Sequence, residues 1–328
     1  MKTLVNQSKK KLNKASIFLG FCLLIIIVLI AINPAKYSAV ALNGILVWAK
    51  ILVPSLLPFF ILTKLFAATG IIDSITNIFA KPINKIYNCP KQSAYVFFMS
   101  IITGYPVGSK LVADLYNNGI ICKTDAIKTT SFCSNSGPMF ILGSVAIGMF
   151  ANAKMGYIIL ASHILGALLN GLIYRKIGGK EKQKKQINQM GNNLNFSESV
   201  ITSVNSIFLI GGVVCFTFVL LEVITNNYIF ISLTNLLSNI GLNANLFSAV
   251  ICGIGEITKG CLMLSSVALS PTFVTCFCTF IISFGGIATF LQAMAFLKGI
   301  VPAKMFLLQK FTHAICATAI CGILVLLL

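Results

Sequence analysis

The chain alternates long apolar stretches with short polar segments. In the first half, apolar residues dominate in five stretches, residues 17–32, 41–68, 95–116, 124–150 and 155–174. A helix that crosses a bilayer needs about 20 predominantly apolar residues, because the hydrocarbon core is about 30 Å thick. The pattern therefore predicts an all-α polytopic membrane protein, and the chain has room for roughly eight to ten spanning segments.

Residues 71–87 follow a different pattern. Apolar residues recur there at helical spacing between the polar side chains of Asp73, Asn77, Lys81 and Lys85. A helix with one apolar and one polar face lies at the membrane surface rather than across the bilayer. We therefore expect an interfacial amphipathic helix in this segment.

Two of the apolar stretches are interrupted near their middle. The first interruption reads TGYPVGSK at residues 103–110, and the second reads SNSGP at residues 134–138. Proline removes a backbone donor and glycine loosens the backbone, so neither continues a regular helix well. Inside a membrane, protein or a water-filled cavity must satisfy the freed backbone groups. The interruptions therefore mark a candidate ligand pathway, although such breaks also occur for packing alone.

The second half of the chain repeats these features. Residues 153–155 recur at 303–305, and His163 recurs as His313, both displaced by 150 positions. At a displacement of 149, the first interruption falls on residues 253–259, which read GIGEITK. At a displacement of 150, the second interruption falls on FGGIA at residues 284–288. We therefore expect an internal duplication. The expected parts are a cytoplasmic N-terminus with a first transmembrane helix at 1–37, a first repeat at 38–177, a basic cytoplasmic linker at 178–198 and a second repeat at 199–328.

The charge distribution predicts the topology. The chain is 57% hydrophobic and 10% charged, whereas soluble domains carry about 25% charged residues. The net charge of +18 comes largely from lysines clustered at residues 2–14 and 175–185. Such clusters mark cytoplasmic segments rather than a nucleic-acid-binding face, so we expect no nucleic-acid partner. With both clusters inside, the first repeat starts outside and ends inside. The two repeats are then inverted, and inverted repeats with broken helices are a transporter architecture.

Catalytic and metal chemistry lack their usual signals. The eleven cysteines are scattered through apolar segments without a CxxC or metal-spaced pattern, and only two histidines are present. Ser134 has no G-x-S-x-G setting and no identifiable base. We therefore expect no enzymatic activity, no metal and no cofactor. The expected partners are the lipid bilayer and a small solute, and homo-oligomerisation stays open.

The interruptions predict how that solute binds. Interrupted helices expose N-terminal amides that favour carboxylates or phosphates. Lys110 and Lys259 each add a positive charge, and Glu256 either pairs with a lysine or accepts a proton. This chemistry favours a small anion with two carboxylates. Alternatively, the two lysines sit at helix ends and snorkel, and the two histidines are satisfied structural residues. The candidate substrate-binding residues are Thr103, Gly104, Tyr105, Pro106, Gly108, Ser109, Lys110, Ser134, Asn135, Ser136, Gly137, Pro138, Gly253, Gly255, Glu256, Thr258, Lys259, Gly285 and Gly286.

Four segments resemble the sporulation integral membrane protein YlbJ family, also called SpoVV. They read WAKILVPSLLPFFILTKLF, SIITGYPVGSKL, TTSFCSNSGPMFILGSVAIGMF and GIGEITKG, and the resemblance extends from about residue 40 to the C-terminus. It implies two nucleoside-recognition (Gate) domains, similar to the core of concentrative nucleoside transporters. It also implies an integral plasma membrane protein of a spore-forming bacterium. There it would export dipicolinic acid from the mother cell across the outer forespore membrane.

Two other functions stay open. In a nucleoside carrier, Ser134, Asn135 and Glu256 would bond ribose hydroxyls and base edges. In a non-transporting scaffold of the spore envelope, the loss of Lys110 or Lys259 would be tolerated.

Overall fold

The computed structural model describes residues 14–69, 71–178 and 196–327, and these residues form helices and no strand. Residues 1–13 of the expected N-terminal segment and most of the expected linker lie outside the described residues. Five helices in the described part are long and apolar enough to cross a membrane: Pro34–Phe66, Ala153–Tyr174, Phe196–Thr225, Pro271–Leu297 and Ala303–Leu327. The prediction of an all-α polytopic membrane protein is confirmed at this level.

The described part of the first half contains ten helical elements. They are α1 (Lys14–Ile32), α2 (Pro34–Val47), the π-helix η1 (Trp48–Leu52), α3 (Val53–Ala68), α4 (Ile71–Tyr87), α5 (Gln92–Thr103), α6 (Val107–Asn117), α7 (Lys123–Cys133), the π-helix η2 (Met139–Ile147) and α8 (Ala153–Tyr174). The amphipathic segment forms α4, with the bounds that its sequence pattern predicts. Its buried side chains, which include Ala80, Ile83 and Tyr87, join one core with residues of α5. That α4 lies at the membrane surface stays a prediction.

The second half repeats the order of the elements from α2 to α8. A long helix comes first, then a short helix, then two interrupted pairs and a final span. These elements are α9 (Phe196–Thr225), α10 (Tyr228–Asn239), α11 (Ala244–Gly255), α12 (Ile257–Leu264), α13 (Pro271–Phe284), α14 (Gly286–Leu297) and α15 (Ala303–Leu327).

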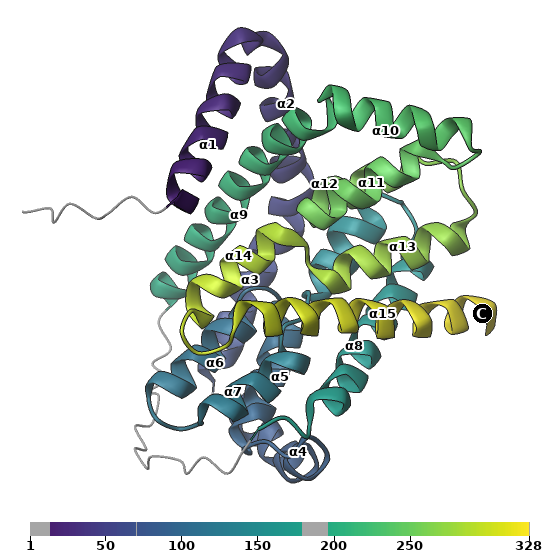
Figure 1. The fold of residues 1–328 in the computed structure, drawn as a ribbon. Helices are drawn as coiled ribbons and strands as arrows, with labels where there is room; N and C mark the ends of the chain where they lie inside the picture. Colours follow the sequence, from purple (N-terminus) through teal and green to yellow (C-terminus); the bar gives the residue numbers. More distant parts are fainter. Residues whose placement is uncertain (1–13, 70, 179–195, 328) are drawn as a thin grey trace, which may run out of the picture.

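Two spans, α8 and α15, pack against each other at the centre of the fold (Figure 1). A Cβ at Gly166 of α8 would lie 2.7 Å from the Cα of Ala317 on α15, so the two backbones approach too closely for a larger residue. Each span also contacts the interrupted segment of the other half, α8 with α13 and α15 with α7. This crossing brings the interruptions of the two halves together.

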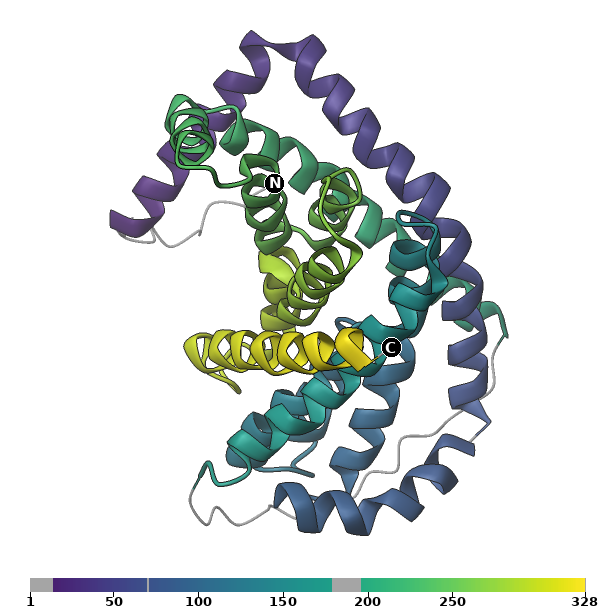
Figure 2. The same cartoon turned by 90° about the vertical axis from the view of Figure 1, so that its right-hand side faces the viewer.

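The run α2–η1–α3 extends along one side of the molecule (Figure 2). It packs against α9, and the indole Nε1 of Trp48 donates a hydrogen bond of 2.9 Å to the carbonyl oxygen of Ile207. This contact joins the first long segment of one half to the first long helix of the other.

The predicted interruptions are all present as helix breaks. Gly104 ends α5 with a φ of 79°, and Gly285 ends α13 with a φ of 87°, a conformation that glycine adopts without steric cost. Residues 134–138 separate α7 from η2, and Glu256 alone separates α11 from α12. The breaks are shorter than the sequence motifs, because Gly108 and Lys110 already lie in α6 and Gly253 lies in α11.

Candidate functional site

A pocket of about 80 Å³ lies where the breaks converge. This volume is smaller than the roughly 300–1,000 Å³ of typical small-molecule sites, so binding of a metabolite requires the pocket to widen. Each of the four interrupted regions contributes to the lining: Thr103, Gly104 and Tyr105; Ser136 and Gly137; Glu256, Ile257 and Thr258; Ala288 and Thr289. The pocket is therefore built from both halves of the chain.

Apolar side chains complete the wall. They come from η1, α3, η2 and α9 and include Leu52, Leu56, Phe59, Phe60, Met139, Phe140, Ile210, Val213 and Val214. Gln292 of α14 adds a polar amide. An apolar and aromatic wall that faces a few hydroxyls and amides suits a planar organic solute.

Three helices begin at this pocket: η2, α12 and α14. The first four N–H groups of a helix have no partner within the helix, so helix starts favour acceptors and negative charge. At α12 the protein supplies its own anion, because the buried Glu256 carboxylate accepts a hydrogen bond of 2.7 Å from the N–H of Lys259. No lysine or arginine appears among the described residues of the lining.

The structure brings seven of the predicted site residues into the lining: Thr103, Gly104, Tyr105, Ser136, Gly137, Glu256 and Thr258. The other twelve do not line it: Pro106, Gly108, Ser109, Lys110, Ser134, Asn135, Pro138, Gly253, Gly255, Lys259, Gly285 and Gly286. A substrate-binding role stays a prediction for all nineteen residues.

The two lysines proposed for charge recognition have other surroundings. Lys110 is exposed on α6. Lys259 is buried, donates to the carbonyl of Phe218 at 3.1 Å and lies 3.5 Å from the Glu222 carboxylate of α9. The second carboxylate oxygen of Glu222 lies 3.9 Å from Lys36. In this arrangement Lys259 joins α12 to α9.

Glycines allow close backbone contact between the break that separates α5 from α6 and the break that separates α7 from η2. A Cβ on Gly104 would lie 2.5 Å from the backbone nitrogen of Gly137, and one on Gly108 would lie 1.8 Å from the carbonyl oxygen of Cys133. Close by, Asn135 donates to the Ser100 hydroxyl at 3.0 Å. Three buried polar atoms have no hydrogen-bond partner among the described residues: Ser109 Oγ, Ser134 Oγ and Asn135 Oδ1.

Sequence reasoning missed Lys310, which lies at the centre of a buried network. Its ammonium donates to Tyr105 Oη at 2.6 Å and to the carbonyl of Ser134 at 2.8 Å, and it lies 3.4 Å from His313 Nδ1. The ring of Tyr105, 4.7 Å from the ammonium, lies beside it. A lysine within a membrane-spanning helix is itself a signal for a site, and this signal was present in residues 303–327.

The two histidines extend the same network. His163 accepts the N–H of Ser136 at 2.9 Å and lies 2.8 Å from the Ser283 hydroxyl. His313 Nε2 lies 2.9 Å from the carbonyl of His163. Both side chains are buried and hydrogen-bonded, which agrees with the alternative that the two histidines are satisfied structural residues. They connect the second break to the end of α13.

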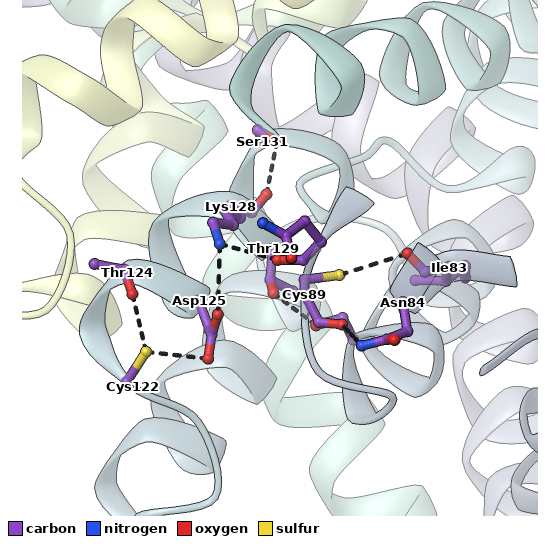
Figure 3. A network of polar contacts seen from close by, with 11 residues as sticks. Ile83, Asn84, Cys89, Cys122, Thr124, Asp125, Lys128, Thr129 and Ser131 are labelled. Carbon is purple, nitrogen blue, oxygen red and sulfur yellow. Dashed lines mark hydrogen bonds and ion pairs between the residues drawn. The ribbon is translucent and has the colours of Figure 1, made fainter. Parts of the chain in front are cut away.

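A second polar network fixes the start of α7 (Figure 3). Lys128 donates to the carbonyl of Asn88 at 2.9 Å and lies 3.8 Å from Asp125, while Cys122 donates to the Asp125 carboxylate at 3.0 Å. Asn84 closes the loop between α4 and α5 by donating to the carbonyl of Cys89 at 2.6 Å. None of these residues lines the pocket. The hydrogen bond from Lys128 to Asn88 connects α7 to the loop between α4 and α5.

These features define a polytopic membrane protein whose interrupted helices enclose a pocket. The chain is 28% identical over 298 residues to the sporulation integral membrane protein YlbJ of Bacillus subtilis (strain 168), and the match covers 81% of this chain and 72% of that protein. The similarity supports the YlbJ family, in line with the resemblance of the sequence motifs. No protein-family profile and no solved structure matches the chain. The Gate-domain relationship therefore stays a prediction.

Proposed function

We propose that this protein is a membrane transporter that binds a small organic metabolite in the pocket between its two halves. The observation that carries the proposal is the convergence of all four interrupted regions on one pocket. Transporters with inverted repeats bind their cargo where broken helices of the two repeats meet. The same order of elements in both halves supports the duplication that this mechanism needs, and the inversion of the two repeats stays a prediction.

The first candidate cargo is a small planar organic anion, with dipicolinate as the specific case. The named relative is a sporulation protein, and the family resemblance implies dipicolinate export across the outer forespore membrane. The starts of η2 and α14 favour carboxylates, and the apolar wall suits an aromatic ring. The positive charge of Lys310, beside the lining residue Tyr105, adds to this preference.

The second candidate is a neutral polar metabolite such as a nucleoside. Glu256 favours it, because a carboxylate in the lining accepts hydrogen bonds from hydroxyls and repels a dianion. A carboxylate of the cargo at about 6 Å from Glu256 is repelled by about 3 kcal/mol at an effective dielectric constant of about 20, a factor of roughly 10² in affinity.

The Glu256→Gln variant separates the two candidates. Purified protein in liposomes is tested for uptake of labelled dipicolinate and of labelled uridine. If dipicolinate is the cargo, Glu256→Gln strengthens its binding by up to roughly 10²-fold, because the repulsion disappears. If a nucleoside is the cargo, the variant weakens uridine binding instead.

The matched control is Asp114→Asn, which removes an acidic side chain of α6 that does not line the pocket and leaves uptake unchanged. Failure of folded wild-type protein to move either cargo, with no effect of Glu256→Gln on the binding of either, contradicts both candidates and supports the envelope scaffold.

A further inference from the structure

Lys310 of α15 presents a cation with no anionic partner. The side chain is 4% exposed, and no carboxylate of the described residues lies within ion-pair distance of it. An ammonium carries three N–H donors. Three acceptors face it, Tyr105 Oη, the Ser134 carbonyl and His313 Nδ1, so no donor is left for a substrate.

The histidine tautomers follow from their partners. His313 Nε2 faces the carbonyl of His163, which can only accept, so Nε2 carries the hydrogen and Nδ1 is free to accept from Lys310. His163 Nε2 accepts the N–H of Ser136, so its hydrogen is on Nδ1, facing Ser283. Neutral acceptors therefore surround the cation.

The cation lies between two of the breaks. Ser134 directly follows the last residue of α7, and the carbonyl end of a helix carries partial negative charge. Tyr105 lies in the break between α5 and α6, and its side chain also reaches the carbonyl of Ile282 at the end of α13. Freed carbonyls and helix C-termini of this kind coordinate the coupling sodium ion in transporters with broken helices.

We infer that Lys310 is a tethered cation that occupies the place where such a transporter would bind a coupling sodium ion. The inference rests on the proposed transport function. It predicts that transport does not depend on sodium. Lys310 positions the two breaks through Tyr105 and Ser134 and does not contact the cargo, because it does not line the pocket.

Shortening the side chain should expose the site that it fills. In Lys310→Ala, the Ser134 carbonyl and Tyr105 Oη lose their donor. The Oγ of Ser134 and the Oδ1 of Asn135, which have no hydrogen-bond partner among the described residues, belong to the same break. A small monovalent cation then replaces the ammonium.

Thermal stability tests the inference without any cargo. Wild type and variants in detergent are heated in sodium chloride or in choline chloride at equal ionic strength, and the fraction that stays monodisperse is measured by size-exclusion chromatography. Wild type should melt at the same temperature in both salts. Lys310→Ala should melt lower in choline and recover saturably with sodium. Lys304→Ala, at an exposed position in the first turn of the same helix, should behave as wild type in both salts.

Two results overturn the inference. One is saturable stabilisation of the wild type by sodium, which reveals a resident sodium site. The other is a folded Lys310→Ala protein that no monovalent cation stabilises. If Lys310→Ala does not fold, Lys310→Arg is tested in the same assay. A folded Lys310→Arg protein with equal melting temperatures in the two salts supports a tethered cation. A Lys310→Arg protein that is stable only in sodium contradicts it.

Uptake of labelled dipicolinate and uridine by wild-type protein in liposomes is also measured in sodium chloride and in choline chloride. Equal uptake supports the inference, and uptake that requires sodium contradicts it. Failure to transport any cargo, together with sodium rescue of Lys310→Ala, rejects the proposed function while the cation site stands.

Discussion

Gly108 is the position where the packing of the first break is tested most directly. A methyl group added in Gly108→Ala would lie 1.8 Å from the carbonyl oxygen of Cys133 and 2.9 Å from the Cβ of Ser100. Ordinary contact starts at 3.4 Å, so the gap to the carbonyl is 1.6 Å too short. The obstacle is backbone at the end of α7, which cannot rotate away as a flexible side chain does.

Overpacking a tight core typically costs about 1–3 kcal/mol. We expect about 3 kcal/mol for Gly108→Ala, because both α6 and the end of α7 must move, and this lowers the ratio of folded to unfolded protein by roughly 10²-fold. The displaced carbonyl precedes Ser134, whose own carbonyl accepts from Lys310, so the change also loosens the buried network.

The assay is the melting temperature in detergent, measured by the same heating and size-exclusion experiment. The matched control is Gly212→Ala in α9, where an added Cβ meets nothing within 4 Å. The control should melt at or slightly above the wild-type temperature, since alanine favours a helix over glycine by about 1 kcal/mol. Equal melting temperatures for Gly108→Ala and wild type would show that α6 and α7 do not pack this closely.

Two further changes test the contacts between long helices. Trp48→Phe removes the indole hydrogen bond to α9, and we expect a loss of about 1 kcal/mol of stability, seen as a lower melting temperature. Lys259→Met breaks the pair with Glu222 and should cost about 2 kcal/mol. Adding Glu222→Gln to that variant should restore part of the melting temperature, and strictly additive losses would show that the two side chains are not coupled.

Much of the architecture could be predicted from local sequence. The length of an apolar run decides whether a helix can span, and glycine and proline interrupt a helix wherever they occur. For this reason the bounds of α4 and the positions of the four breaks agree with the sequence pattern. Seven of the candidate residues also line the pocket, because the breaks themselves form it.

The partners of the charged side chains could not be predicted in this way. Lys110 and Lys259 follow equivalent motifs, yet one is exposed and the other pairs with Glu222, 37 positions away in the chain. Lys310 lies far from every interruption in the sequence, and only the crossing of α15 over α8 and α7 brings it to Tyr105 and Ser134. The sequence alone determined the apolar stretches and the breaks, because hydrophobicity and backbone conformation are local properties. Which charges meet at the breaks was decided only by the tertiary structure, because such contacts depend on how distant helices pack.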